Sequence, residues 1–385
     1  MPSCVAFLPW LALQSPVTVD DVRLIPYRRG LAPGDTTTAT QADVDGVLAA
    51  YAIRKDHPVE RAALVEVGDW HTGQDADDET RERLFRVREL LTFTGLAGRE
   101  FFRGRGYCSF DNFALYLQRF VPGDTQHFTF NTRRRDGGAS ITWGATDFAF
   151  LKPLHVDENA RPNIDERFLF ALLQADAASQ APFSAIVEFN RANSDSQDVP
   201  VHTEVVMTKS AFEYFLDVGH KSDEMVAAFL RIVPPRLGNR PLQGPLANRW
   251  PMVRGGVPIR AIETWAREFC VRRNESAHGA RRGANQNLVW SEHAHLAFAA
   301  ILLPLLVKQR LAAGGFYQMR EVEQIQLELI ESYLMFDPFA PVASPYEHPE
   351  HPWSTVYSEE VVREKLRRGL EREMAKIDWA NIPPQ

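Results

Sequence analysis

Cysteine is scarce in this sequence of 385 residues, which contains Cys4, Cys108 and Cys270 and no CxxC pair. Scattered cysteines argue against a disulfide framework and against a zinc site built on cysteines. They are typical of proteins from a reducing cytosol. We therefore expect a cytoplasmic protein without a bound metal or other cofactor.

An excess of positive charge and a long apolar run are also missing. The net charge is −7, so the molecule as a whole does not have the charge of a nucleic-acid-binding protein, and any RNA site must be a local basic patch. The most apolar run, Leu296–Val307, is only about twelve residues long and contains Pro304, which predicts a buried core helix and no membrane span. The apolar N-terminus lacks a basic n-region and is not expected to be a signal peptide.

The sequence also lacks the common catalytic motifs. There is no G-x-S-x-G, no P-loop and no G-x-G-x-x-G after a strand. His293 and His295 are two residues apart, so on a helix they point in different directions and do not form the zinc-protease pair. His348 and His351 lie in a proline-spaced polar segment, which favours a loop over a metal site.

The residues that are present predict an α+β fold in two domains, because 385 residues exceed what one core usually holds. Residues 1–152 predict a strand-rich domain, with a hairpin around Arg133–Gly138. The arginines at its tip could contact RNA, but a solvated turn is the plainer interpretation. Lys152–Pro162 is the expected linker, with Asn163 as the cap of the next helix, and residues 163–385 predict an all-α domain.

Within the helical half, we expect helices near the segments that follow. At the end we expect a charged amphipathic helix with the apolar face Val362, Leu366, Leu370 and Ile377. Packing of this face against the core is favoured over the alternative, an arm that binds a partner. The expected segments are Ile164–Ala175, Phe183–Asn190, a helix opened by Pro200, Met225–Val233, Ala261–Arg273, Ser291–Leu311 and Val322–Phe336.

One helix end stands out chemically. In Ala261–Arg273 the apolar residues follow helical spacing, and Arg273 falls on the face where a buried residue is expected. Asn274 and His278 are four residues apart and share a face if the helix continues for one more turn. Gly279 is a suitable stop signal. The segment therefore gathers a guanidinium, an amide and an imidazole, with Arg272, Arg281 and Arg282 close by in the sequence.

Arg273-Asn274, three further residues and His278 resemble the R-N-x-x-x-H signature of HEPN domains, a helical family with many metal-independent ribonucleases. The segments Phe189–Asp195 and Ser210–Glu213 resemble earlier helices of the Apea-like HEPN branch, so the resemblance covers roughly residues 180–335. It implies an endoribonuclease that produces 2′,3′-cyclic phosphate and 5′-hydroxyl ends. It also implies a homodimer through the helical half, with two motif copies facing one cleft.

The resemblance implies that the catalytic residues are Arg273, Asn274 and His278. Arg272, Arg281 and Arg282 are the expected RNA-binding residues. Histidine suits proton transfer near neutral pH, and a guanidinium suits the charge that develops on phosphate oxygens. By analogy with bacterial antiviral and toxin systems, residues 1–152 are expected to bind an unidentified trigger and to supply no catalytic group.

Two alternatives stay open at this point. The arginine-rich helix end is also typical of a solvated cap that complements the helix dipole. The helical half could also be a non-catalytic HEPN scaffold that binds RNA or a nucleotide. The sequence departs from the family pattern at Ala280, where some HEPN toxins carry a tyrosine that a partner enzyme modifies.

Overall fold

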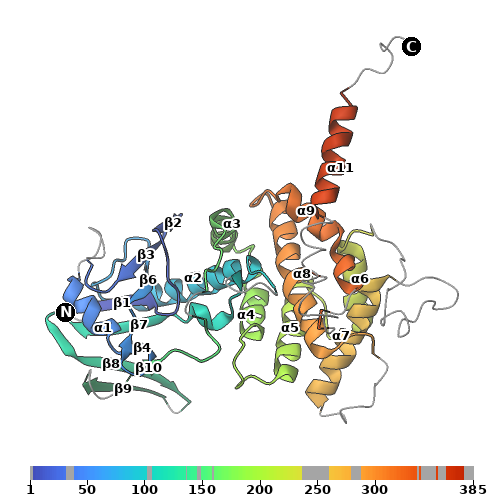
Figure 1. Cartoon of the computed structure of the whole chain (residues 1–385). Coiled ribbons are helices and arrows are strands. Elements are labelled where there is room, and N and C mark those ends of the chain that lie inside the picture. The colour runs from blue at the N-terminus through green and yellow to red at the C-terminus, as the bar shows by residue number, and fades with distance from the viewer. Residues whose placement is uncertain are drawn as a thin grey trace, which may run out of the picture. The chain divides into compact units, whose positions relative to one another are not determined.

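The computed structural model describes residues 3–31, 39–101, 106–135, 137–144, 149–157, 160–235, 260–278, 288–335, 338–339, 353 and 361–376. The chain forms two compact units, Met1–Val199 and Pro200–Gln385. The first contains the sheets and the second is helical (Figure 1), so the predicted α+β class is confirmed.

The first unit is built on an antiparallel seven-stranded sheet in the order β2-β3-β6-β1-β7-β8-β9. Its central strand β1 is buried along its whole length and pairs with β6 on one side and with β7 on the other. The bounds are β1 Ser3–Leu8, β2 Val17–Val19, β3 Val22–Arg28, β6 Arg61–Val67, β7 Tyr116–Val121, β8 Asp124–Arg134 and β9 Gly137–Gly144. The predicted hairpin is β8 and β9, paired from His127 opposite Gly144 to Arg134 opposite Gly137.

Helix α1 (Gln41–Leu48) covers part of this sheet and begins with a capping box formed by Thr40 and Asp43. Its apolar side chains share a core with Val5 and Phe7 of β1. The helix ends at Leu48, and β4 begins at Tyr51. A second, three-stranded sheet consists of β10 Phe150–Leu151, β4 Tyr51–Arg54 and β5 His57–Pro58.

Helix α2 (Asp78–Ala97) organises the rest of the first unit. Asp77 caps its first turn by accepting a hydrogen bond from the Thr80 N–H at 2.8 Å, as expected of the acidic segment before it. Gly95 is required inside the helix because a Cβ there would lie 2.2 Å from the Phe113 ring. That ring belongs to η2 (Phe110–Phe113), in the segment 107–120 whose structure the sequence left undecided.

The helices α3 (Glu166–Ala177) and α4 (Phe183–Ala192) pack against α2 in the first unit. The sequence assigned them to the helical domain, because periodicity shows that a helix forms and not which core it joins. The compact division therefore falls at Val199 and not at the expected linker. The cap of α3 also differs from the prediction, since the Asp165 carboxylate and not Asn163 accepts the Phe168 N–H.

The second unit contains, in its described part, α5 Val201–Leu216, α6 Ser222–Ile232, α7 Ala261–His278, α8 Glu292–Ala313, α9 Glu321–Glu328, η4 Ile330–Met335 and α11 Val361–Met374. Pro200 opens α5, as predicted, and Ser291 caps α8, which was expected to begin near this residue. The loop expected over residues 236–258 and most of the proline-rich segment 338–352 lie outside the described residues. Helix α8 passes through Pro304 and is long and apolar enough to cross a membrane. Of its 18-residue apolar window, 61% is buried inside the structure, which also fits the predicted core helix.

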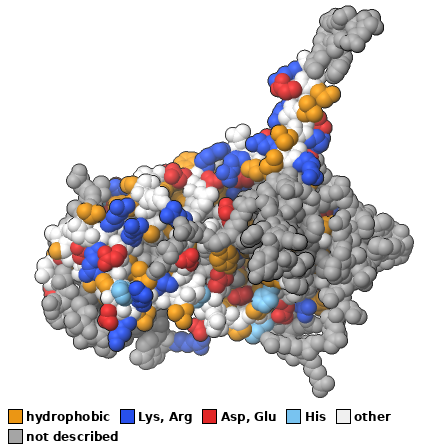
Figure 2. All heavy atoms as spheres, in the orientation of Figure 1, with side chains coloured by type: hydrophobic (Ala, Val, Ile, Leu, Met, Phe, Trp, Pro, Cys, Tyr) orange, Lys and Arg blue, Asp and Glu red, His pale blue; other side chains and the backbone are white. Residues whose placement is uncertain are grey.

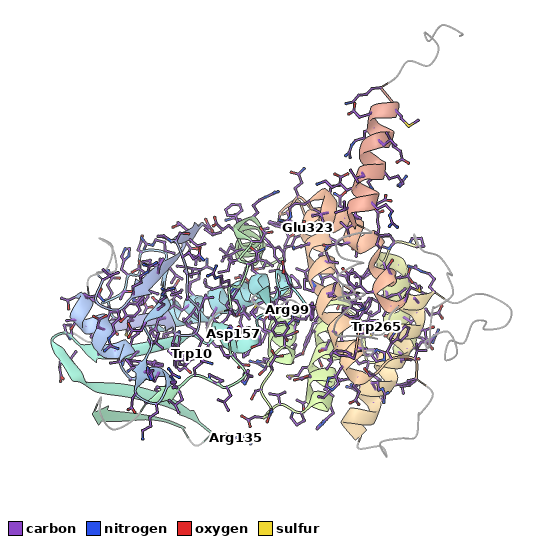
Figure 3. The ribbon with its side chains drawn as sticks, viewed as in Figure 1. Trp10, Arg99, Arg135, Asp157, Trp265 and Glu323 are labelled. Atoms are coloured by element: carbon purple, nitrogen blue, oxygen red, sulfur yellow. The ribbon has the colours of Figure 1, made fainter. Side chains whose placement is uncertain are left out.

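An aromatic core holds α5, α6, α7 and α8 together. Trp265 of α7 is fully buried, and its ring lies 4.8 Å from Phe298 of α8 and 5.5 Å from Phe229 of α6 (Figure 3). Phe212 of α5 completes the contact at 5.9 Å. Such edge-to-face aromatic packing gives the four helices one fixed arrangement.

A buried ion pair joins α8 to α9. Lys308 of α8 donates to the Glu323 carboxylate at 2.7 Å, and both side chains are buried. Tyr317 and the Arg320 guanidinium donate to the same carboxylate. Glu323 is labelled in Figure 3. Burial alone would raise the pKa of Glu323, but the charge of Lys308 and the hydrogen bonds from Arg320 outweigh it and lower the pKa to about 2.

Candidate functional site

The motif helix α7 runs unbroken from Ala261 to His278, so the predicted additional turn is present. Its last turns carry Arg272 and Arg273, both half-buried, and Asn274, which is exposed. The backbone of His278 ends the helix, while the side chain of His278 and all of Arg281 and Arg282 lie outside the described residues.

The first turn and the middle of α7 are held in place through buried carboxylates. Glu331 of η4 accepts the Ile262 N–H at 3.0 Å and pairs with Arg260 at 2.7 Å. Further along the helix, Glu268 accepts the backbone N–H groups of Val289 and Trp290, which lead into α8. Because these contacts bridge segments distant in sequence, they fix the direction of α7 and hence where its last turn lies.

Arg273 lies next to a small polar cluster that α5, α6 and α7 form together. At its centre is Cys270, one turn before Arg273. Burial raises the pKa of the Cys270 thiol, although a hydrogen bond from Ser222 and the positive charges of Lys209 and Arg273 act to lower it. Lys209 is only 1% exposed and donates to Glu213. Glu213 therefore pairs with a basic neighbour on the same helix.

Sequence reasoning missed Lys209. It lies four residues after Val205 and three before Phe212, both fully buried, so it occupies the apolar stripe of α5. This is the same signal that singled out Arg273: a cation at a position where the helical period requires a buried residue. A search of every helix for a cation at a buried position would have found both Lys209 and Arg273.

The guanidinium of Arg273 has unused hydrogen-bonding capacity. Its Nη1 donates to the Asn274 side-chain oxygen at a long 3.4 Å. Its Nε is buried and, within the described part of the chain, has no hydrogen-bond partner. A buried donor without a partner is unfavourable. A guanidinium with spare donors is chemically suited to anionic oxygens.

The helix geometry separates the motif residues into two directions. At about 100° per residue, the backbone positions of Asn274 and His278 lie on one face of α7, whereas the position of Arg273 lies about 140° from that of His278. The negative end of the helix dipole, at which these positions lie, stabilises cationic side chains. The backbone of α7 therefore carries Arg273 on one face and the positions of Asn274 and His278 on another.

The two histidines at the start of α8 occupy different surroundings, as their spacing predicted. His293 is exposed, while His295 is fully buried among the rings of Trp265, Phe269 and Trp290. Its Nε2 lies 3.5 Å from the Glu268 carboxylate, and burial lowers its pKa. His295 is therefore neutral at neutral pH and belongs to the core beside the motif helix.

The first unit contains a polar cluster that the sequence did not reveal. His155 lies 3.0 Å from the Asp111 carboxylate through its Nε2, and Ser194 donates to the same oxygen at 2.7 Å. Nearby, the buried Arg99 (labelled in Figure 3) bonds to Asn193, and Tyr107 donates to Asp195 at 3.0 Å. These residues come from four separate segments, so no sequence motif connects them.

The expectation that the first unit supplies no catalytic group can be tested at this cluster. His155→Ala should leave RNA cleavage by the full chain within about twofold of the wild-type rate, because proton transfer by a histidine contributes about a hundredfold or more. Single-turnover rates for His155→Ala and Asp111→Asn provide the measurement. A loss of two orders of magnitude in both variants, with an unchanged melting temperature, would place a catalytic pair in the first unit.

No protein-family model, curated protein or solved structure matches this chain.

Proposed function

We propose that the protein is a metal-independent endoribonuclease whose site lies at the end of α7 and uses Arg273, Asn274 and His278. Single-stranded or looped RNA is the substrate. Successive phosphates of its backbone are held by Arg272, Arg281 and Arg282. The observation that carries this proposal is the guanidinium of Arg273, half-buried with an unpartnered Nε, at the same helix end as Asn274.

The reaction follows from the chemistry of these groups. A base removes the proton from a ribose 2′-hydroxyl, and the 2′-oxygen attacks the adjacent phosphorus. The bond from phosphorus to the 5′-oxygen breaks, an acid protonates that oxygen, and the products are a 2′,3′-cyclic phosphate and a 5′-hydroxyl. His278 suits the proton transfers, and Arg273 suits the negative charge on the phosphate oxygens.

A second copy of the chain supplies a second motif helix that can face the first. Because the positions of Arg273 and His278 lie about 140° apart on one helix, these residues converge on one phosphate most readily when two motif helices face each other. One histidine then acts as base and the other as acid. The proposed active form is accordingly a homodimer through the helical unit.

The product ends and the metal requirement test this proposal. The full chain should cleave a mixed RNA pool equally well with and without EDTA, since no step needs a metal ion. The products should resist digestion by an exonuclease that requires a 5′-phosphate. They should carry a free 3′-hydroxyl only after the cyclic phosphate has been removed enzymatically. Loss of activity in EDTA, or 5′-phosphate ends, would refute the mechanism.

A non-catalytic scaffold is the second candidate, and the same 140° separation favours it if the chain acts as a monomer. In that case Arg273 binds phosphate and the chain retains RNA without cleaving it. Filter binding that depends on Arg273 and falls steeply with salt, without any cyclic-phosphate product, distinguishes this function from the nuclease.

The cellular role is part of the same proposal. Three free cysteines, all buried, support a cytoplasmic protein. A nuclease joined to a separate strand-rich unit suits a bacterial antiviral or toxin-like system, in which the first unit binds the trigger.

A further inference from the structure

An antiparallel strand pair of the first unit places two arginines directly opposite each other. Arg28, the last residue of β3, is the register partner of Arg61, the first residue of β6, and both side chains are exposed. Opposite residues of such a pair have Cβ atoms about 5 Å apart, and like charges at that separation destabilise the pairing. An anion bound between the two guanidinium groups would relieve this repulsion.

Three further cations belong to the segments around this pair. Arg29 follows Arg28 directly and is half-buried. Arg54 ends β4, and Lys55 lies in the turn to β5, a few residues before Arg61; both side chains are exposed. We call these five residues, Arg28, Arg29, Arg54, Lys55 and Arg61, the basic corner.

The cations of the basic corner are not paired within their own chain. In the described part of the protein, none of their side chains forms a hydrogen bond or an ion pair, and the buried Nη1 of Arg29 has no partner. Of the neighbouring acidic residues, Asp56 and Glu60 are exposed and form no ion pair with described residues, and Asp45 accepts a hydrogen bond from Tyr27. The five cations therefore outnumber the three carboxylates, and the basic corner has an excess of positive charge.

Several other arginines of the first unit are paired with carboxylates. Figure 2 shows positive and negative side chains mixed on the visible face of this unit. The pairs are Arg23 with Glu66, Arg83 with Asp21, Arg86 with Asp176, Arg88 with Glu89 and Arg119 with Asp75. An external anion would supply the partners that the basic corner lacks.

The cations of the basic corner lie on both faces of the seven-stranded sheet. Arg28 and Arg61 lie on the face opposite to Tyr27, because neighbouring residues of a strand alternate between the two faces. Tyr51 of β4 packs in the same core as Tyr27, so the β4–β5 hairpin and its two cations lie over the other face. A flexible chain of phosphates can follow cations around the end of a sheet, whereas a flat lipid surface meets one side.

We propose that the basic corner binds the phosphate backbone of a single-stranded nucleic acid, without regard to its sequence. Four of the five cations are arginines, whose planar guanidinium groups bind phosphate oxygens through two parallel hydrogen bonds. Each nucleotide carries one phosphate, so one strand supplies an anion for each cation. The site consists of residues of the first unit alone, and the proposal concerns binding and does not depend on RNA cleavage.

Binding of a fluorescent, mixed-sequence 2′-O-methyl RNA to the full chain tests the proposal, because this probe lacks the 2′-hydroxyl that the proposed cleavage requires. In anisotropy titrations between about 50 and 200 mM salt, log affinity should fall with log salt by about 0.7 for each phosphate contact. Arg28→Ala combined with Arg61→Ala should weaken binding by at least about tenfold and reduce that slope by about 1.4, the value for two contacts. The melting temperature should not fall, since the variant removes opposed like charges.

Arg81→Ala combined with Arg191→Ala is the matched control. These arginines of the same unit pair with Asp78 and Glu188, and their removal changes the net charge equally. The control should change the affinity by less than about twofold, because neither arginine belongs to the basic corner. A wild type that does not bind the probe at about 50 mM salt, an unchanged salt slope in the Arg28 and Arg61 variant, or an equal loss in the control would overturn the proposal. Equally tight binding of polyglutamate or of phosphatidylserine vesicles through the same two arginines would also overturn it.

Discussion

His278→Ala should lower the rate of RNA cleavage by about a hundred- to ten-thousand-fold, because it removes the group proposed for proton transfer. Arg273→Ala should cause a loss of about a hundred- to a thousand-fold, because a fixed cation no longer meets the charge that develops on the phosphate. Single-turnover cleavage of one defined RNA measures both effects. Full activity of His278→Ala would exclude the mechanism.

Stability and cleavage should respond in opposite directions at Arg273. Its buried Nε lacks a partner among the described residues, so truncation removes an unfavourable group. We therefore expect Arg273→Ala to be at least as stable as the wild type while it loses activity. A residue retained at a cost in stability is typical of a functional site.

Two matched variants serve as controls for this prediction. Arg267 lies on the same helix and pairs with Asp223 and Glu263, and His220 is exposed on the same unit. Arg267→Ala and His220→Ala each remove the same type of side chain as the motif variants, and both should retain wild-type cleavage. If either of them lost activity as the motif variants do, the effect would not be specific to the motif.

Glu323→Gln should lower the free energy of unfolding of the helical unit by roughly 3–5 kcal/mol, the usual cost of breaking a buried ion pair on one side. The substitution leaves the buried Lys308 without its carboxylate at 2.7 Å. Urea unfolding, combined with hydrogen exchange of the α8 and α9 amides, measures the change. Lys308→Met combined with Glu323→Leu should recover most of the loss, because it removes both charges together.

The pH dependence of stability provides a second measurement of the same pair. The pKa of Glu323 is about 2 in the folded chain, below its ordinary value of 4.5. A depressed carboxyl pKa stabilises the fold above about pH 4.5, and this contribution is lost as the pH falls toward 2. Glu323→Gln should flatten that decline. Glu321→Gln, at an exposed pair on the same helix, should have a much smaller effect; an equal effect would contradict the importance of burial.

The sequence predicted the elements whose signals are local. Helix α7 and helix α8 were found from the period of their apolar residues, and the β8–β9 hairpin was found from its Asp-Gly turn. In each case a few neighbouring residues determine the backbone conformation. The start of α5 at Pro200 follows the same logic, since proline is favoured in the first turn.

The errors arose where distant segments decide the outcome. Helices α3 and α4 were given to the wrong core because their periodicity is identical whichever partner they pack against. Val362, Leu366 and Leu370 of α11 are exposed, although we expected them to pack on the core. An amphipathic pattern does not show whether its apolar face meets the same chain or another. The cluster around Asp111 and His155 was missed for a related reason: its members are close only after folding.

The position of β1 in the sheet determines the order in which the protein can assemble during synthesis. Ser3 pairs with Phe120, so β1 must wait for more than a hundred further residues before its neighbours are complete. Its apolar residues Val5, Ala6, Phe7 and Leu8 remain exposed during that interval, and such long-range pairing is slow. We therefore expect the first unit to be the slow step of folding and the part that most needs chaperones.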